Sequence, residues 1–407
     1  STGEILDAGV YTFTANTATG CNLLTENITI GQPDEIVINE DETLTSEECG
    51  VTRFQLTAQV VDPNLGVGRW EIISPTNTSA SIEDATSTNT WFNGEANTTY
   101  EVSWIVTPAN DLCGEISNTV TIEVPNTCSK LDFDGVDDHI NAGSNFSMGG
   151  KDFSLEAWIK PNNLTGVKTI ISKRREGDNN IGYDLFLNQG VPTFRVRNRS
   201  VSGTKKVDTD RWYHVAAVYS ASRMTLYVDG IEIQNNTNNI PGGSGNFDEP
   251  FIIGAAYTAN NISNTKEHFN GFIEEVRIWE DEISKQQIQF FMNQRLQKTG
   301  NQVEGTILDN SLNLTNAPES PSWNTLVGYY QLLAEENLIT DGSTPNLGSV
   351  GNSAAGLLKN IQSLQQNTAP LPYISNNDGN WDTMNTWLRP DVWDSPNSKG
   401  INEESIS

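Results

Sequence analysis

The feature that most constrains this chain is a set of five short strings with apolar residues at alternate positions. They are Leu131–Asp138, Phe153–Lys160, Arg211–Tyr219, Met224–Gly230 and Gly271–Trp279. Successive residues of a β-strand point to opposite faces of its sheet, so each string predicts a strand with one apolar face. Asp229-Gly230 favours a tight hairpin turn. Five such strands in about 150 residues, with no long helical pattern between them, predict an antiparallel sandwich of two sheets.

Composition limits the possible partners of the chain. Acidic residues outnumber basic residues by 52 to 24, which argues against nucleic acid as a partner. No run approaches the ~20 apolar residues of a membrane-spanning helix, so we expect no membrane insertion. Residues 1–128 hold 19 acidic residues and only two basic ones, Arg53 and Arg69, whereas the central segment is nearly neutral. This pattern suits secreted modules, and the length of 407 residues favours two to four domains.

The five strings and their order resemble the laminin-G-like, or concanavalin-A-like, jelly-roll family. The resemblance covers roughly residues 129–300, and Leu326–Leu332 looks like the family's terminal strand, so we place this domain at residues 129–365. The resemblance implies a two-sheet jelly roll that binds glycans or protein surfaces, often with a calcium ion, and is not a catalyst. We therefore expect an all-β chain.

The segments before this domain are predicted to be further β modules. Residues 34–128 have the spacing of strands and turns that fits an immunoglobulin-like sandwich. Residues 1–33 resemble the closing half of the repeats in SprB-type adhesins of gliding bacteria, because a Gly-x-Tyr-Thr strand leads to a Gly-Cys turn. An oxidising extracellular setting permits disulfides. The four cysteines allow three sets of pairings, among which the sequence does not choose; Cys49 with Cys113, across the sandwich, is the preferred pair, and Cys21 with Cys128 stays open.

The segments after the strands contain one predicted helix and a tryptophan-rich tail. Ile283–Leu296 has a helical apolar stripe, with Ser284 as the N-cap and Gln287 three residues later, and we expect it to cap the sandwich. Residues 366–407 are predicted to begin a further small β module. Two interpretations stay open for its evenly spaced tryptophans: they stack on sugars, or they anchor strands. These residues are Trp381, Trp387 and Trp393.

The first candidate site is acidic. Asp134 and Asp137 flank a turn, and Glu274 falls in phase with Phe272, Val276 and Ile278, which would carry its carboxylate inward if that phase faces the core. Carboxylates from a turn and a neighbouring strand suit Ca²⁺, which takes 6–8 oxygen ligands. The resembled family commonly binds calcium near these positions, usually with Asp where this chain has Glu274. The alternative is that Glu274 pairs with an arginine and the aspartates shape a turn.

The second candidate site is basic. Arg195, Arg197 and Arg199 would share one face of a single strand, because their spacing matches the two-residue period. A row of guanidinium groups binds carboxylate or sulfate. We therefore consider an acidic glycan as a ligand, with Tyr183 as a nearby stacking partner. The alternative is a solvated strand whose arginines pair with the chain's own carboxylates.

Catalysis finds little support in the sequence. Glycoside hydrolases of this sandwich need two carboxylates across a cleft, but the adjacent Glu274 and Glu275 point to opposite faces of a strand. The three histidines, His139, His214 and His268, lack a triad signature. We expect a non-catalytic module of a bacterial cell-surface adhesin that recognises a polysaccharide or surface component. The alternatives are an accessory glycan-binding module of a secreted polysaccharide-degrading enzyme and a spacer without a ligand.

Overall fold

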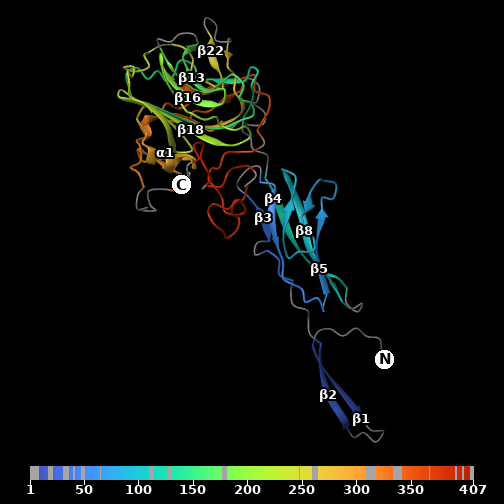
Figure 1. The fold of residues 1–407 in the computed structure, drawn as a ribbon. Helices are drawn as coiled ribbons and strands as arrows, with labels where there is room; N and C mark the ends of the chain where they lie inside the picture. The colour runs from blue at the N-terminus through green and yellow to red at the C-terminus, as the bar shows by residue number, and fades with distance from the viewer. Residues whose placement is uncertain are drawn as a thin grey trace. The chain divides into compact units, whose positions relative to one another are not determined.

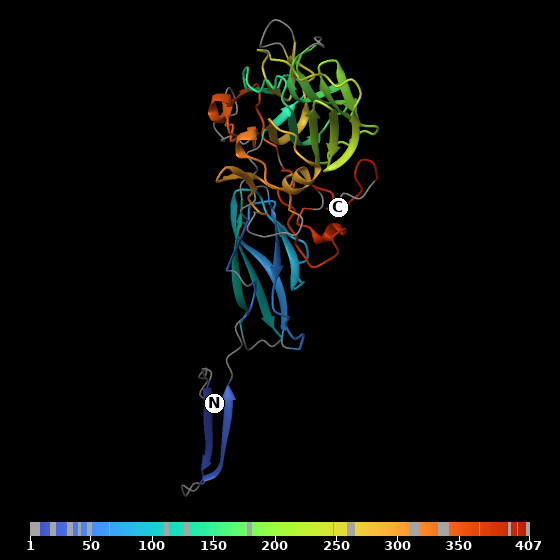
Figure 2. The ribbon, with the colours of Figure 1, turned by 90° about the vertical axis from the view of Figure 1, so that its left-hand side faces the viewer.

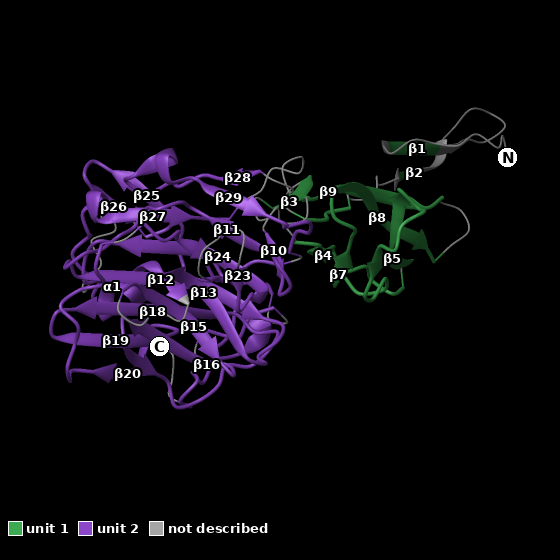
Figure 3. Cartoon of the chain, turned by 90° about the horizontal axis from the view of Figure 1, so that it is seen from above, with its two compact units in different colours: residues 1–127 green, residues 128–407 purple. Residues whose placement is uncertain are grey.

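The chain divides into two compact units, residues 1–127 and residues 128–407 (Figure 3). The computed structural model describes residues 9–16, 22–30, 36–39, 42–46, 51–64, 66–109, 114–125, 131–176, 181–246, 248–258, 265–308, 317–332, 342–365, 367–389, 392–396 and 398–403. The predicted disulfide partners Cys49 and Cys113 lie outside these residues, as do Cys21 and Cys128. Among the described residues, no helix is long and apolar enough to cross a membrane.

Unit 1 contains a hairpin and a separate pair of sheets. The hairpin joins β1 (Gly9–Asn16) to β2 (Asn22–Ile30) (Figure 1). The first sheet has the order β3 (Thr43–Thr45), β9 (Ile116–Val124), β8 (Thr98–Pro108) and β5 (Gly66–Ser74). The second has the order β4 (Arg53–Thr57), β7 (Asn89–Asn93) and β6 (Ser81–Ile82).

The sheets of residues 43–124 share a buried aromatic core. Trp70 and Trp104 are buried, with ring centroids 5.2 Å apart, and Phe92 of β7 contacts Tyr100 of β8. Figure 2 shows the long strands of this module. The two-sheet arrangement agrees with the predicted β-sandwich, and its immunoglobulin-like classification stays a prediction.

Unit 2 is built on a seven-stranded and an eight-stranded sheet. The first has the order β10 (Asp132–Asp134), β24 (Asn270–Trp279), β12 (Phe153–Pro161), β18 (Tyr213–Ser220), β19 (Arg223–Val228) and β20 (Ile231–Asn236), and β27 (Leu326–Tyr330) also pairs with β24. The second has the order β17 (Arg199–Ser202), β16 (Val191–Val196), β15 (Tyr183–Asn188), β13 (Val167–Lys173), β21 (Ile252–Ile253), β11 (His139–Asn141), β29 (Gly356–Lys359) and β28 (Ser343–Thr344).

Short elements complete unit 2. They are β14 (Arg175–Glu176), β22 (Ala256–Thr258), β23 (Thr265–Lys266), α1 (Lys285–Phe291), the hairpin of β25 (Leu296–Thr299) and β26 (Gln302–Gly305), and the 3₁₀ turns Trp323–Thr325, Gly351–Ala354 and Met384–Thr386. The prediction of an all-β chain with a single short helix is therefore confirmed for the described residues.

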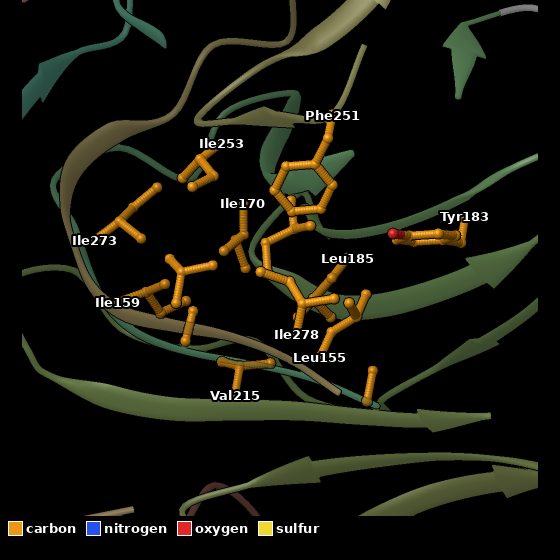
Figure 4. Packing of buried hydrophobic residues seen from close by; sticks show 14 of the residues in the cluster. Leu155, Ile159, Ile170, Tyr183, Leu185, Val215, Phe251, Ile253, Ile273 and Ile278 are labelled. Atoms are coloured by element: carbon orange, nitrogen blue, oxygen red, sulfur yellow. The ribbon is translucent and has the colours of Figure 1, made fainter. Parts of the chain in front are cut away.

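The apolar faces of the two large sheets form the main core. Alternate residues of β12, namely Leu155, Ala157 and Ile159, are fully buried there. The eight-stranded sheet contributes residues such as Ile170 and Leu185 to the same cluster (Figure 4). The predicted hairpin turn also forms, because Val228 pairs with Ile231 and the two intervening residues have positive φ. Alternation of apolar residues thus located the core-facing side of these strands.

The predicted helix is shorter than expected. Its N-terminus is confirmed, because the side chain of Ser284 accepts a hydrogen bond from the Gln287 backbone N–H, and the Gln287 side chain accepts one from the Ser284 backbone N–H. The helix ends at Phe291, however, and Leu296 begins strand β25. The predicted end at Leu296 was wrong because the apolar stripe continued past the helix into a hairpin that packs on the same sheet.

A β-bulge in β24 changes which residues face the core. Glu275 has φ +51°, and the register between β12 and β24 shifts between the pairs Glu156–Arg277 and Trp158–Glu274. As a result Val276 faces the core with Ile273 and Ile278, whereas Glu274 does not. Sequence phase had placed Glu274 on the same face as Val276 and Ile278. That expectation was wrong, because the inserted residue reverses the alternation.

The outer face of the seven-stranded sheet is also buried. One apolar cluster on it joins Trp279 and Tyr329 to Ile288 and Phe291 of α1. A second joins Trp158 and Trp212 to residues of the C-terminal segment, Ala369 and Trp393 among them. The described part of residues 367–396 therefore packs on the jelly roll, which differs from the separate module expected from residue 366. This covering segment creates the site described below.

A glycine in β24 offers a test of this packing. Gly271 has φ +129°, and a Cβ added there would lie 2.1 Å from the Lys160 carbonyl oxygen. We expect Gly271→Ala to lower the free energy of unfolding by about 3 kcal/mol or more, from backbone strain plus overpacking. The control Gly166→Ala, with φ +77° and open space around the Cβ, should cost about 1–2 kcal/mol. Equal losses in urea unfolding would contradict the argument.

Candidate functional site

The acidic turn after β10 brings together three aspartates. Asp134, Asp137 and Asp138 each place a carboxylate oxygen within 4.8 Å of the others, and Asp138 is buried while the other two are exposed. Gly135, with φ +79°, allows the chain to turn between them. The backbone N–H of Asp134 donates to Asp138 at 2.9 Å, and that of Val136 donates to Asp134 at 2.7 Å. These bonds hold the carboxylates close together.

Burial, and then the neighbouring negative charges, perturb Asp138. Burial, followed by the charges of Asp134 and Asp137, raises the pKa of the Asp138 carboxyl from its ordinary value to about 7. Carboxylate oxygens are among the ligands that Ca²⁺ prefers, and the acidic turn supplies three carboxylates close together. The donor set present therefore fits a hard cation.

Glu274 does not belong to this acidic turn. Asp134 pairs with Asn270 in β24, and Glu274 lies four residues further along that strand, or about 13 Å away. Its buried carboxylate instead accepts hydrogen bonds from the Ala369 backbone N–H, at 3.2 Å, and from the Gln365 side chain. The structure thus brings together two of the three predicted metal ligands and supplies Asp138 in place of the third.

The three predicted arginines do not form one row. Strand β16 ends at Val196, Arg197 lies in the hairpin turn with φ +51°, and Arg199 begins the returning strand β17. The Nε of Arg195 donates to the buried Asp184 at 2.9 Å. The single-strand interpretation was wrong because a turn interrupts the two-residue period. Phe194 and Val196, which alternate with Arg195 along β16, belong to the buried core.

Tyr183 is part of the core rather than a surface for stacking. Its side chain is fully buried, its ring centroid lies 4.8 Å from that of Phe153, and its hydroxyl donates to the Phe146 carbonyl at 2.8 Å. Figure 4 shows the ring among the core residues. The predicted ligand contact was wrong because Tyr183 lies on the inward face of β15.

A pocket of about 600 Å³ lies between the outer face of the seven-stranded sheet and the C-terminal segment. We call it the aromatic pocket. Its lining consists of Trp158, Arg211, Trp212, Asp229, Gln289, Phe290, Met292, Asn293, Gln294, Ile307, Leu308, Pro372, Tyr373, Trp381, Trp393, Asp394 and Pro396. Sequence positions almost 240 residues apart therefore meet in one cavity of the size that small-molecule sites have.

Hydrogen bonds fix the deep walls of the aromatic pocket. The indole N–H groups of Trp158, Trp212 and Trp393 donate to the Met292 carbonyl at 2.6 Å, to the Asn367 side chain at 3.1 Å and to the Thr368 carbonyl at 2.8 Å. All three side chains are buried. A buried indole with a satisfied N–H has little freedom to move. The deep walls of the aromatic pocket are therefore preformed.

The mouth of the aromatic pocket carries an exposed tryptophan. Trp381 is 59% exposed and packs edge-on against Trp387, with centroids 4.9 Å apart. Trp387 and Trp393 are buried, and Tyr373 contacts both rings. The two interpretations of the tryptophan-rich tail thus apply to different residues. Trp387 and Trp393 anchor the segment, whereas Trp381 is available to a ligand.

Three charged residues line the aromatic pocket. Arg211 Nε lies 2.5 Å from Asp394 Oδ2, and Arg211 Nη2 lies 3.8 Å from Asp229 Oδ2. Burial raises the pKa of the Asp229 carboxyl to about 6, against the opposing effect of Arg211. A buried carboxyl with a raised pKa in a cavity is a typical feature of functional sites. One guanidinium therefore lies beside both carboxylates of the aromatic pocket.

Sequence reasoning missed Arg211 and Asp229 as site residues. They occur in strings that we interpreted as a strand and a turn, and neither residue belongs to a known catalytic or binding motif. The two side chains meet because Arg211 precedes β18, Asp229 follows β19, and these strands pair with Val215 opposite Val228. Both residues lie at adjoining ends of two strands that were predicted to form a hairpin, and this position could have predicted that their side chains meet. Asp394 carried no such signal, because its approach depends on the tail folding back.

The raised pKa of Asp229 predicts a pH-dependent difference between the wild type and Asp229→Asn. The folded protein retains a proton on Asp229 between about pH 4 and 6 that the unfolded chain has lost, so this group's stabilisation falls as pH rises through that window. The Asn variant does not titrate and tolerates the turn conformation. The difference between their unfolding free energies should change by on the order of 2–3 kcal/mol from pH 4 to pH 7. Urea unfolding at both pH values measures it, and a constant difference would refute it.

A family model agrees with the fold of unit 2. Residues 134–289 match the family model described as the concanavalin A-like lectin/glucanases superfamily. A putative carbohydrate binding protein from Bacteroides ovatus is 17% identical, with a TM-score of 0.40, 81% of this chain covered and 97% of that one. A Ruminococcus gnavus sialidase CBM40 bound to sialyllactose is 13% identical, with a TM-score of 0.31, 38% of this chain covered and 94% of that one.

A third solved structure, domain 4 of an arabinanase from Geobacillus stearothermophilus in complex with arabinotriose, is 19% identical, with a TM-score of 0.31, 48% of this chain covered and 82% of that one. At these TM-scores the similarities give no information about the ligand. Comparison with curated proteins gives no significant match. The family match and the sheet topology together identify the β-sandwich of unit 2 as a concanavalin A-like jelly roll.

Proposed function

We propose that unit 2 is a non-catalytic glycan-recognition module and that the aromatic pocket is its binding site. The observation that carries this proposal is the combination of an exposed Trp381 at the mouth with buried polar groups inside the same cavity. A pyranose ring has apolar C–H faces that pack on aromatic rings, and its edge carries hydroxyls that bond to carboxylates and amides. The lining supplies both kinds of surface.

The wider biological proposal is a module of an extracellular, cell-surface adhesin. It is supported by the acidic composition, by the succession of β modules and by a pocket built for binding. A glycan-binding module attached to a polysaccharide-degrading enzyme would use the same chemistry. Cells or beads that display the 407-residue chain should attach to a surface coated with the bound glycan if the adhesin proposal is right.

We also propose a structural calcium ion at the acidic turn. Asp134, Asp137 and Asp138 would hold it. When bound, Ca²⁺ would offset the mutual repulsion of these carboxylates. The residues themselves keep the turn after β10 in place through their hydrogen bonds to backbone N–H groups.

Removal of the exposed indole tests the glycan site. We expect Trp381→Ala to weaken binding of the best ligand from a glycan array about tenfold, because a lost stacking contact costs about 1–1.5 kcal/mol. The control Met384→Ala removes a side chain that is 50% exposed in the same segment but outside the pocket, and should bind like the wild type. Isothermal titration calorimetry measures both affinities.

Two outcomes would count against this function. If no arrayed glycan binds the wild type, or if Trp381→Ala and Met384→Ala bind equally well, the aromatic pocket is not a glycan site. If prolonged incubation releases reducing ends from the bound glycan, the module is catalytic. A shortened glycan chain would therefore overturn the non-catalytic assignment even if the pocket is correct.

The calcium proposal has a separate test. After dialysis against chelator, millimolar Ca²⁺ should raise the melting temperature of the wild type by a few degrees, because a ligand that binds only the folded state stabilises it. Asp137→Asn should abolish most of this shift, since it removes a charged ligand from the acidic turn. Asp378→Asn, an exposed aspartate outside the turn, should retain it. An unchanged wild-type melting temperature would refute the site.

A further inference from the structure

We infer that the aromatic pocket selects an uncharged saccharide and that Asp229 is the residue that sets this preference, by accepting a hydrogen bond from a sugar hydroxyl. This inference rests on the proposed glycan-binding function. It goes beyond that function because it names the class of glycan and the group that recognises it.

The geometry of Asp229 leaves one of its two carboxylate oxygens without a hydrogen-bond donor. The residue is 6% exposed, and its Oδ1 accepts a hydrogen bond from the His214 backbone N–H at 2.9 Å. Its Oδ2 accepts no hydrogen bond from any residue that the structure describes. Arg211 Nη2 lies 3.8 Å away, beyond hydrogen-bond distance. A buried carboxylate oxygen without a hydrogen bond destabilises the folded protein, and a ligand that donates a hydrogen bond to it would remove that cost.

The missing partner must be a donor, because an ionised carboxylate only accepts. The pocket next to Asp229 is otherwise lined mostly by apolar and aromatic side chains, so a charged donor would lose its hydration there. A sugar hydroxyl supplies an O–H group on a body whose apolar face fits the aromatic walls. A hydroxyl group is therefore the donor that can hydrogen-bond to Asp229 with the smallest desolvation cost.

The charges of the lining disfavour an anionic sugar. Arg211 carries the positive charge among the lining residues, whereas Asp229 and Asp394 carry two negative ones. Arg211 is already occupied by Asp394 at 2.5 Å. A uronate or sulfate in the pocket would meet an excess negative charge in a partly dehydrated cavity, where repulsion is stronger than in water.

This selectivity differs from the acidic glycan expected from the arginine strand. That expectation depended on Arg195, Arg197 and Arg199 sharing one face, and the hairpin between β16 and β17 separates them. The geometry of the described residues thus favours an uncharged ligand in the aromatic pocket. It does not support the arginine row on which the acidic ligand was predicted.

The experiment uses the 407-residue chain and matched sets of oligosaccharides. Each set contains a neutral gluco-, manno- or galacto-oligosaccharide and its uronate, sulfated and amino counterparts. We expect the neutral member of the preferred set to bind at least tenfold more tightly than its anionic counterparts. Asp229→Asn should weaken neutral binding about ten- to a hundredfold, the range for a lost hydrogen bond to a charged group. Asp378→Asn is the control and should bind like the wild type.

A second measurement separates recognition from a structural effect of the substitution. A deoxy analogue that lacks the recognised hydroxyl should bind the wild type weakly, and Asp229→Asn should not weaken its binding further. If Asp229→Asn reduces the affinity for all deoxy analogues as much as for the parent sugar, the residue acts only on the structure, and the inference is overturned.

The remaining outcomes distinguish this inference from the proposed function. Anionic or amino sugars that bind as tightly as the neutral one, with a loss on Trp381→Ala, would overturn the inference and leave glycan binding at the pocket intact. Absence of binding for every sugar would overturn both. Tight neutral binding that depends on Trp381 but not on Asp229 would keep the site and reject Asp229 as its selecting residue.

Discussion

The arrangement of unit 2 depends on the burial of both faces of its seven-stranded sheet. One face packs on the second sheet, and the other carries ionised side chains that must find partners because water is excluded from them. Arg277, fully buried on this outer face, donates to the carbonyls of Phe291 at 3.0 Å and Gln294 at 2.6 Å, which follow or end helix α1. Without these carbonyls the buried guanidinium would keep the carboxylates of Glu275 and Glu156 beside it but lose two of its hydrogen bonds. The need to satisfy Arg277 therefore holds the helix and its hairpin against the sheet.

The same requirement holds the C-terminal segment. Glu274 accepts hydrogen bonds from Gln365 and Ala369, and Arg211 binds Asp394. The segment in turn supplies Trp381 and Tyr373 to the aromatic pocket. Because the ion-paired residues and the aromatics that line the pocket lie on one segment, the site forms only when the tail packs on the sheet. This coupling places the pocket over the outer face of the sheet, beside the strand ends that carry Arg211 and Asp229.

The strands in which apolar and polar residues alternate without interruption were predictable from the sequence. The strings Phe153–Lys160 and Met224–Gly230 form strands β12 and β19 with the expected residues inside, because their apolar positions keep a two-residue period throughout. Prediction failed where that period breaks. The bulge at Glu275 reversed the phase of β24, and the turn at Arg197 divided the arginine row between two strands. One residue out of step is enough to send a side chain to the opposite face.

The candidate sites were predictable to different extents. The acidic turn was largely visible, since Asp134, Asp137 and Asp138 lie within five positions of one another and a short turn must keep them close. The aromatic pocket was not, since Trp158, Arg211, Asp229 and Trp381 lie far apart in the sequence. Local order alone determined the strands, the helix cap and the acidic turn, because each rests on residues a few positions apart. The tertiary structure decided which strand ends adjoin, which face the tail covers and which charges meet, because those contacts depend on packing between distant segments.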